Sequence, residues 1–116
     1  MTIPARAHFC WIGTHLPWAY AFAVLSAAER SELPEIVLHH TDALDEDAAL
    51  AALKQTPCVR LSRVDPLAYL MHAGQKLGAG DELTVTYRRL TNPAARIDVL
   101  RAAILYLEGG MFGLSS

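Results

Sequence analysis

Several features that mark specialised classes of protein are scarce in this sequence. It has only two cysteines, Cys10 and Cys58, and neither a Cys-x-x-Cys pair nor a cysteine–histidine spacing typical of a zinc site. Both cysteines lie inside short apolar runs, which favours two reduced, buried thiols over a disulfide. Lysine and arginine are scattered and the formal net charge is -2. Nucleic-acid-binding proteins usually carry a clustered basic surface, so that class is not indicated.

Long apolar runs are also lacking. No uninterrupted run approaches the ~18 residues that would span a membrane. The N-terminal residues lack the basic start, apolar core and small-residue cleavage site of a signal peptide. We therefore expect no membrane span and, by default, a cytoplasmic protein. The hydrophobic fraction of 53% and charged fraction of 19% are typical of a globular protein, and 116 residues suffice for one domain at most.

Short apolar segments alternate with segments of helical pattern. Strands are predicted at residues 7–12, 35–39 and 58–61, and helices at 18–30, 45–54, 65–77 and 94–108. Asp45 is the predicted cap of the second helix. Residues 83–88 follow a glycine-rich stretch and are predicted to be irregular or a short strand. The alternation predicts an α/β domain, with a parallel sheet covered by helices.

Ligands of such sheets bind at the carboxyl ends of the strands. Trp11, Gly13 and the segment 39–42 fall at that position. The Trp11 ring would stack on a planar base there, or else fill the core. Gly13 would let the backbone approach a ligand closely. Asp42 would accept hydrogen bonds from a ribose, or else serve as a turn residue.

A charged pair and the histidines were considered as further ligand-binding or metal-binding residues. Asp98 and Arg101 share one face of the last predicted helix, where they form either a surface ion pair or an inward pair for a polar ligand such as a sugar.

His39 and His40 are adjacent in a strand and point to opposite faces, so a joint metal site is not expected. His8, His15 and His72 are isolated and are assigned no role. Gly-x-Gly-x-x-Gly, Walker A and Gly-x-Ser-x-Gly motifs are absent.

Two segments together resemble a known family. Residues 3–13, IPARAHFCWIG, resemble the opening IPxxxHFxWIG of glycosyltransferases with a DxD-containing sugar-binding region, a group that includes the family 32 transferases and the glucosylating clostridial toxins. Residues 95–112, ARIDVLRAAILYLEGGMF, resemble the second signature of that family, roughly A-x-x-D-x-x-R-x-x-x-L-y-x-x-G-G-x-Y-x-D-x-D. The resemblance spans residues 3–112.

The resemblance implies a GT-A-type, Rossmann-like nucleotide-binding sheet covered by helices. It also implies transfer of a hexose from a nucleotide sugar, with a UDP-sugar expected, to an acceptor. Trp11 resembles the residue that stacks on the donor base, and Asp42 resembles a nucleotide-side position. Asp98 and Arg101 resemble the pair that holds the sugar and phosphate region of the donor.

The sequence departs from the family where the metal site is expected. The family binds Mn²⁺ or Mg²⁺ through the Asp-x-Asp carboxylates, but Leu114 and Ser116 stand at those positions. We therefore expect an incomplete domain, the N-terminal portion only, with no metal ligands there and no activity as this chain. The alternatives are a non-catalytic nucleotide-sugar-binding module or a small α/β protein-interaction module, which self-associates through an exposed sheet edge.

Overall fold

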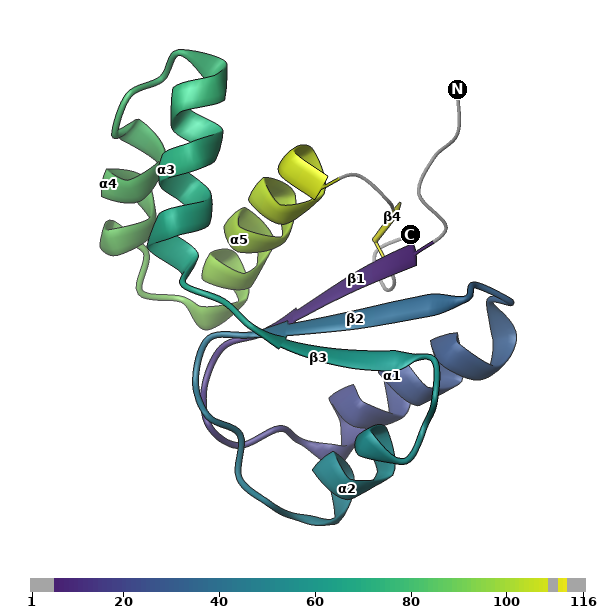
Figure 1. Ribbon diagram of the computed structural model, residues 1–116. Helices are drawn as coiled ribbons and strands as arrows, with labels where there is room; N and C mark the ends of the chain where they lie inside the picture. The colour runs from purple at the N-terminus through teal and green to yellow at the C-terminus, as the bar shows by residue number, and fades with distance from the viewer. Residues whose placement is uncertain (1–5, 109–110, 113–116) are drawn as a thin grey trace.

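A computed structural model describes residues 6–108 and 111–112 of the chain (Figure 1). Its centre is a sheet with the strand order β3-β2-β1-β4. The strands are β1 (Arg6–Trp11), β2 (Glu35–His40), β3 (Val59–Arg63) and the two-residue β4 (Met111–Phe112). All three pairings are parallel. The α/β class and the parallel sheet predicted from the sequence are thus confirmed.

Five helices are described, and they divide between the two faces of the sheet. They are α1 (Trp18–Arg30), α2 (Ala48–Lys54), α3 (Pro66–Leu77), α4 (Glu82–Arg89) and α5 (Pro93–Glu108). Figure 1 shows α1 and α2 on one face, and α3, α4 and α5 on the other. Parallel strands need such crossovers, because each chain segment must return to the amino end of the sheet before the next strand.

The register decides which side chains meet which helices. Cys10 lies opposite His39, and Phe9 opposite Leu38. Successive side chains alternate between faces, so Phe9 and Leu38 point towards one face and Cys10 and His39 towards the other. The two faces form two separate clusters of buried residues, one packed with α1 and α2 and the other with α3, α4 and α5. A sheet covered on both sides therefore accounts for the near-continuous apolar strands.

Most helix boundaries follow from local signals. Asp65 caps α3 by accepting a hydrogen bond from Leu67 N at 3.1 Å, Pro66 occupies the first turn, and Gly78 ends the helix in a left-handed conformation with φ 76°. The cap of α2 is Asp47, which accepts from Leu50 N at 3.1 Å. The prediction of Asp45 for this role was wrong by two residues, because both aspartates precede the same alanine-rich run.

The prediction for residues 83–88 was wrong, because they lie in the helix α4. Thr84, Val85 and Thr86 are β-branched and suggest a strand when read locally. Thr84 and Tyr87 are nevertheless buried three residues apart, which is helical spacing. Packing of α4 against α3 therefore overrides the local preference.

The expectations of reduced cysteines and of no membrane span can also be compared with the structure. Both cysteines are free; Cys10 is buried, whereas Cys58 is only partly buried. Within the described ranges, no helix has the length and apolar character needed to cross a membrane.

Candidate functional site

A polar cavity lies where β1, β2 and β3 end. Its volume is about 370 Å³. It is lined by Ile12, Thr41, Asp42, Asp65, Pro66, Leu67, Tyr87, Arg88 and Arg96. The first five of these follow the carboxyl ends of the three strands, and the others come from the helices α3, α4 and α5. Its position is the one at which open α/β sheets bind ligands.

Asp42 joins the loops that follow β1 and β2. Its Oδ2 accepts hydrogen bonds from Gly13 N at 3.1 Å and from Thr41 Oγ1 at 2.9 Å. Thr41 N in turn donates to the Trp11 carbonyl at 3.2 Å. Gly13 has φ 116°, a backbone conformation that other residues rarely adopt. These bonds hold the Asp42 carboxylate in place at the wall of the cavity.

Two arginines, Arg88 of α4 and Arg96 of α5, supply positive charge to the same lining. The Arg96 guanidinium lies 5.0 Å from the centre of the Tyr87 ring, a cation–π distance. Its Nε donates to the Leu90 carbonyl at 2.7 Å, which orders the side chain. Arg88 is exposed beside it. Burial raises the pKa of Tyr87, and the nearby Arg96 charge opposes this rise. Arg96 is therefore a cation held in place by its contacts, whereas Arg88 is exposed to solvent.

Trp11 lies outside the lining of this cavity. Its indole Nε1 donates to the His15 carbonyl at 3.0 Å, and its ring packs 5.0 Å from the Tyr20 ring of α1, tilted by 44°. The Tyr20 hydroxyl accepts from Cys10 N at 3.2 Å and donates to the Cys10 carbonyl at 2.7 Å. Tyr20 thus satisfies the backbone of β1 and supports the partly exposed Trp11 ring.

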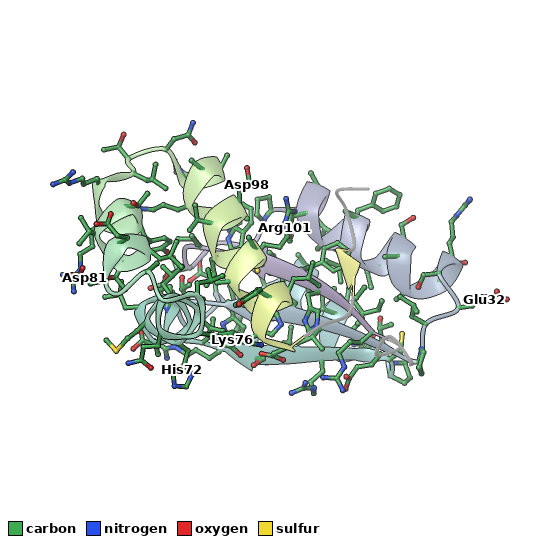
Figure 2. The ribbon with its side chains drawn as sticks, turned by 90° about the horizontal axis from the view of Figure 1, so that it is seen from above. Glu32, His72, Lys76, Asp81, Asp98 and Arg101 are labelled. Carbon is green, nitrogen blue, oxygen red and sulfur yellow. The ribbon has the colours of Figure 1, made fainter. Side chains whose placement is uncertain are left out.

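Asp98 and Arg101 form the ion pair that their spacing predicts, with 2.9 Å between Oδ1 and NH2. Asp98 is 67% exposed, whereas Arg101 is only 16% exposed. Figure 2 shows both on the side of α5 that faces away from α3. Arg101 is also close enough to Cys10 and Tyr20 to lower their pKa values, although burial raises both to about 12. The pair therefore combines a half-buried cation with an exposed carboxylate.

The predicted residues therefore form two groups. Gly13 and Asp42 meet directly beside the cavity, while Trp11 and Arg101 both neighbour Tyr20. Both groups lie at the carboxyl half of β1, on different sides of it.

Sequence reasoning missed several residues that line the cavity. They are Asp65, Tyr87, Arg88 and Arg96. Tyr87 and Arg88 were missed because α4 was not predicted as a helix. The signal that would have found them is the pair of arginines at the end of α4, followed by Arg96 one turn into α5.

A second polar group is buried beneath α3 and α5. His8 Nδ1 lies 2.8 Å from His39 Nε2, and the two rings stack with 5.1 Å between their centres. Glu108, the last residue of α5, accepts a hydrogen bond from the Tyr69 hydroxyl of α3. Burial, together with the neighbouring His8, lowers the pKa of His39 to about 4. The His39 ring is therefore neutral at pH 7.

The assignment of no role to His8 overlooked this contact. His39 and His40 do point apart as expected, since His40 Nδ1 donates to the Asp42 carbonyl at 2.7 Å. The partner of His39 is instead His8, a diagonal neighbour on the adjacent strand. Two histidines in the middle of buried parallel strands were the available signal, but the register was needed to bring them together.

The residues at the expected positions do not fit the cation site that the sequence resemblance implies. Leu114 and Ser116 offer no carboxylate, and they lie outside the described residues. Among the residues described, one group has three metal-ligating side chains within reach of one another, and Asp42 and Asp65 do not belong to it. No protein-family model, curated protein or solved structure matches this chain.

Proposed function

We propose that the chain binds a nucleotide-sugar donor, with a UDP-sugar as the expected form, at the carboxyl edge of its sheet. The observation that supports the proposal is the cavity of about 370 Å³ at the strand ends, whose lining combines the carboxylates Asp42 and Asp65 with the arginines Arg88 and Arg96. Such a charge distribution suits a ligand that has both hydroxyl groups and phosphates. Hexosyl transfer is the reaction class that the resemblance implies, and the proposal concerns its binding step.

The carboxylates are suited to the hydroxyl groups of the donor. A carboxylate offers about four acceptor sites, and Asp42 uses two of them on Gly13 and Thr41. The remaining sites can accept from a ribose or hexose hydroxyl without breaking the loop contacts. Asp65 is exposed at the same wall, although one of its oxygens already caps α3.

The arginines are suited to the diphosphate. A guanidinium binds phosphate oxygens through paired N–H donors. Arg96 donates from Nε to the Leu90 carbonyl at 2.7 Å and from Nη2 to the Arg88 carbonyl at 3.4 Å, which orders the side chain and reduces the entropy lost on binding. The remaining N–H groups of its Nη1 and Nη2 can donate to a ligand. Arg101, whose charge acts on Tyr20, supplies a further cation outside the lining of the cavity. No residue is assigned a catalytic role.

The test is calorimetric titration of the whole chain with UDP and, separately, with UDP-glucose. The chain has two tryptophans, and Trp18 is 55% exposed, so a Trp18→Phe background isolates the fluorescence of Trp11. We expect saturable binding of one nucleotide with no dependence on Mn²⁺, and a change in Trp11 emission only if the nucleotide extends beyond the cavity to the Trp11 ring, which does not line it.

Variants test where the nucleotide binds. Arg96→Gln removes a charge-assisted contact, worth roughly 1.5–3 kcal/mol, and should weaken binding by about tenfold or more. Arg89→Gln is the matched control, because Arg89 is exposed on α4 but does not line the cavity. Equal effects of the two variants, or no binding at millimolar UDP, would refute the proposal and favour the protein-interaction alternative.

A further inference from the structure

His8, His39 and Glu108 form a compact group, called here the His–His–Glu cluster. His39 lies opposite Cys10 in the register, so His8 is its diagonal neighbour on the same face of the sheet. Both histidines are buried, at 0% and 2% exposure. Glu108 reaches them from the end of α5. Three segments that are distant in the sequence therefore converge on one point under the helices.

The three side chains have the chemistry of a transition-metal site. One ligand atom from each lies within 4.8 Å of the other two. Two imidazoles and one carboxylate are a ligand set used for zinc, with water in the fourth position. The nitrogen ligands favour zinc and its neighbours over Mg²⁺ and Ca²⁺, which prefer oxygen.

The distance between the two histidines needs only a small adjustment. The two facing nitrogens are 2.8 Å apart, which is a hydrogen-bond distance. Tetrahedral zinc with Zn–N bonds of about 2.0–2.1 Å would hold them about 3.3 Å apart. A metal ion would thus take the place of the proton that the two rings share, and the nitrogens would separate by about half an ångström.

The surroundings also resemble the outer shell of a metal site. The Tyr69 hydroxyl donates to the Glu108 carboxylate, and the Tyr69 ring meets His39 edge-on, with 6.4 Å between ring centres. Hydrogen bonds of this kind orient the ligands of a metal. In the described part of the chain, His39 Nδ1 has no hydrogen-bond partner although it is buried. An unsatisfied buried nitrogen is costly, so a role that uses this ring is expected.

We propose that the His–His–Glu cluster binds one divalent transition-metal ion, with zinc as the best fit. None of its residues lines the carboxyl-edge cavity, so the site is independent of nucleotide binding. The ion would connect β1, β2 and the end of α5, and would stabilise the fold because an unfolded chain does not hold the three ligands together.

The test is titration of the full, chelator-treated chain with Zn²⁺ alone, followed by calorimetry and thermal unfolding. Co²⁺ gives a second readout through the visible bands of a four-coordinate ion. We expect one Zn²⁺ per chain, a higher melting temperature, and no comparable effect of Mg²⁺. Glu108→Gln keeps an acceptor for Tyr69 but removes the charged ligand, so it should weaken zinc binding by about tenfold or more.

Two further variants make the result decisive. His39→Gln should abolish stoichiometric binding, and circular dichroism must show that the variant is folded; if it is not, Glu108→Gln decides. The matched control is the double variant His15→Gln, His72→Gln, which removes two exposed imidazoles and should bind zinc as the wild type does. The proposal is wrong if zinc does not bind stoichiometrically, or if the control loses binding while Glu108→Gln retains it.

Discussion

The two imidazoles on β1 and β2 occupy positions where buried parallel strands usually carry apolar side chains. Their hydrogen bond satisfies one nitrogen of each ring. Burial is the largest effect that favours a neutral His39, and the His8, Arg60 and His40 charges also lower its pKa, whereas the Glu108 charge raises it. The cluster is therefore a polar element of the core whose protonation is linked to folding.

Metal-free protein should lose stability as the pH falls from about 6.5 to about 4. The pKa of His39 is about 4 in the folded chain, compared with an ordinary value of 6.5. Over this range the unfolded chain takes up a proton that folded His39 does not, so acid favours unfolding. The difference between these two pKa values corresponds to about 3 kcal/mol of folding free energy. This contribution is fully present above pH 6.5 and is lost as the pH falls towards 4. Urea unfolding with a chelator, at a series of pH values, measures the loss.

A suitable control for this pH dependence is His72→Gln, which changes an exposed histidine of α3. Its unfolding curves should show the same loss as the wild type. In contrast, the loss should be much smaller in folded His39→Gln. Equal stability of the wild type at pH 7 and pH 5 would contradict the pH prediction.

At the scale of elements, the helices were predictable wherever the chain carries explicit boundary signals. Pro17 precedes α1, Pro66 opens α3, and Pro93 opens α5. The α4 segment has no proline at its start, and its N-cap residue Asp81 makes no side-chain hydrogen bond to the helix. Its helical form depends on burying Thr84 and Tyr87 against neighbouring helices, which local propensity cannot show.

The contact between α3 and the loop after it leads to a second prediction. A Cβ at Gly74 would lie 2.4 Å from the Gly80 carbonyl oxygen. Because this oxygen belongs to the backbone, relieving the clash requires the loop to shift, which costs free energy. Replacing a helical glycine by alanine usually stabilises by about 1 kcal/mol, but overpacking costs about 1–3 kcal/mol. We therefore expect Gly74→Ala to be destabilising by roughly 1 kcal/mol, as measured by urea unfolding.

Gln75→Ala is the control for this substitution, because Gln75 is exposed on the same turn of α3. It should change the free energy of unfolding by less than about 0.5 kcal/mol. A gain in stability for Gly74→Ala would show that the loop moves aside at little cost.

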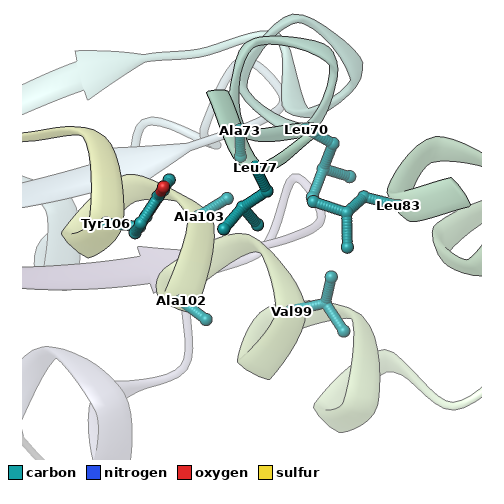
Figure 3. Close-up of a pocket in the computed structure, with 8 residues that line it drawn as sticks. All are labelled: Leu70, Ala73, Leu77, Leu83, Val99, Ala102, Ala103 and Tyr106. Carbon is teal, nitrogen blue, oxygen red and sulfur yellow. The ribbon is translucent and has the colours of Figure 1, made fainter. Parts of the chain in front are cut away.

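At the scale of the whole molecule, the helices on one face leave an apolar groove between them (Figure 3). The groove has a volume of about 440 Å³. It is lined by Leu70, Ala73, Leu77, Leu83, Val99, Ala102, Ala103 and Tyr106. Alanines on the α5 side leave this space unfilled, so packing among α3, α4 and α5 is loose here.

Filling the groove should stabilise the fold. Ala102→Leu adds three carbons at its wall, and each buried CH₂ contributes about 0.8 kcal/mol when fully buried. Since the groove is open, we expect a gain of about 0.5–2 kcal/mol in the free energy of unfolding. Ala19→Leu on α1 is the control with the same change in helix propensity at an exposed position outside the groove. Similar effects of both variants would mean that the groove does not accept the side chain.

The sequence by itself determined the class of fold. Apolar runs of strand length, alternating with helices bounded by proline, aspartate and glycine, require a parallel sheet covered on both faces. It also placed Gly13 and Asp42 at the edge of that sheet, because a residue that follows a strand must lie at its carboxyl end.

Only the tertiary structure decided which side chains meet. Strand register brings His8 to His39 across adjacent strands, and helix packing brings Arg96 to the same cavity as Asp42. It also directs Trp11 towards Tyr20 and away from that cavity. Such contacts depend on crossovers, register and helix orientation, which arise from burial of the whole chain and have no local signature in the sequence.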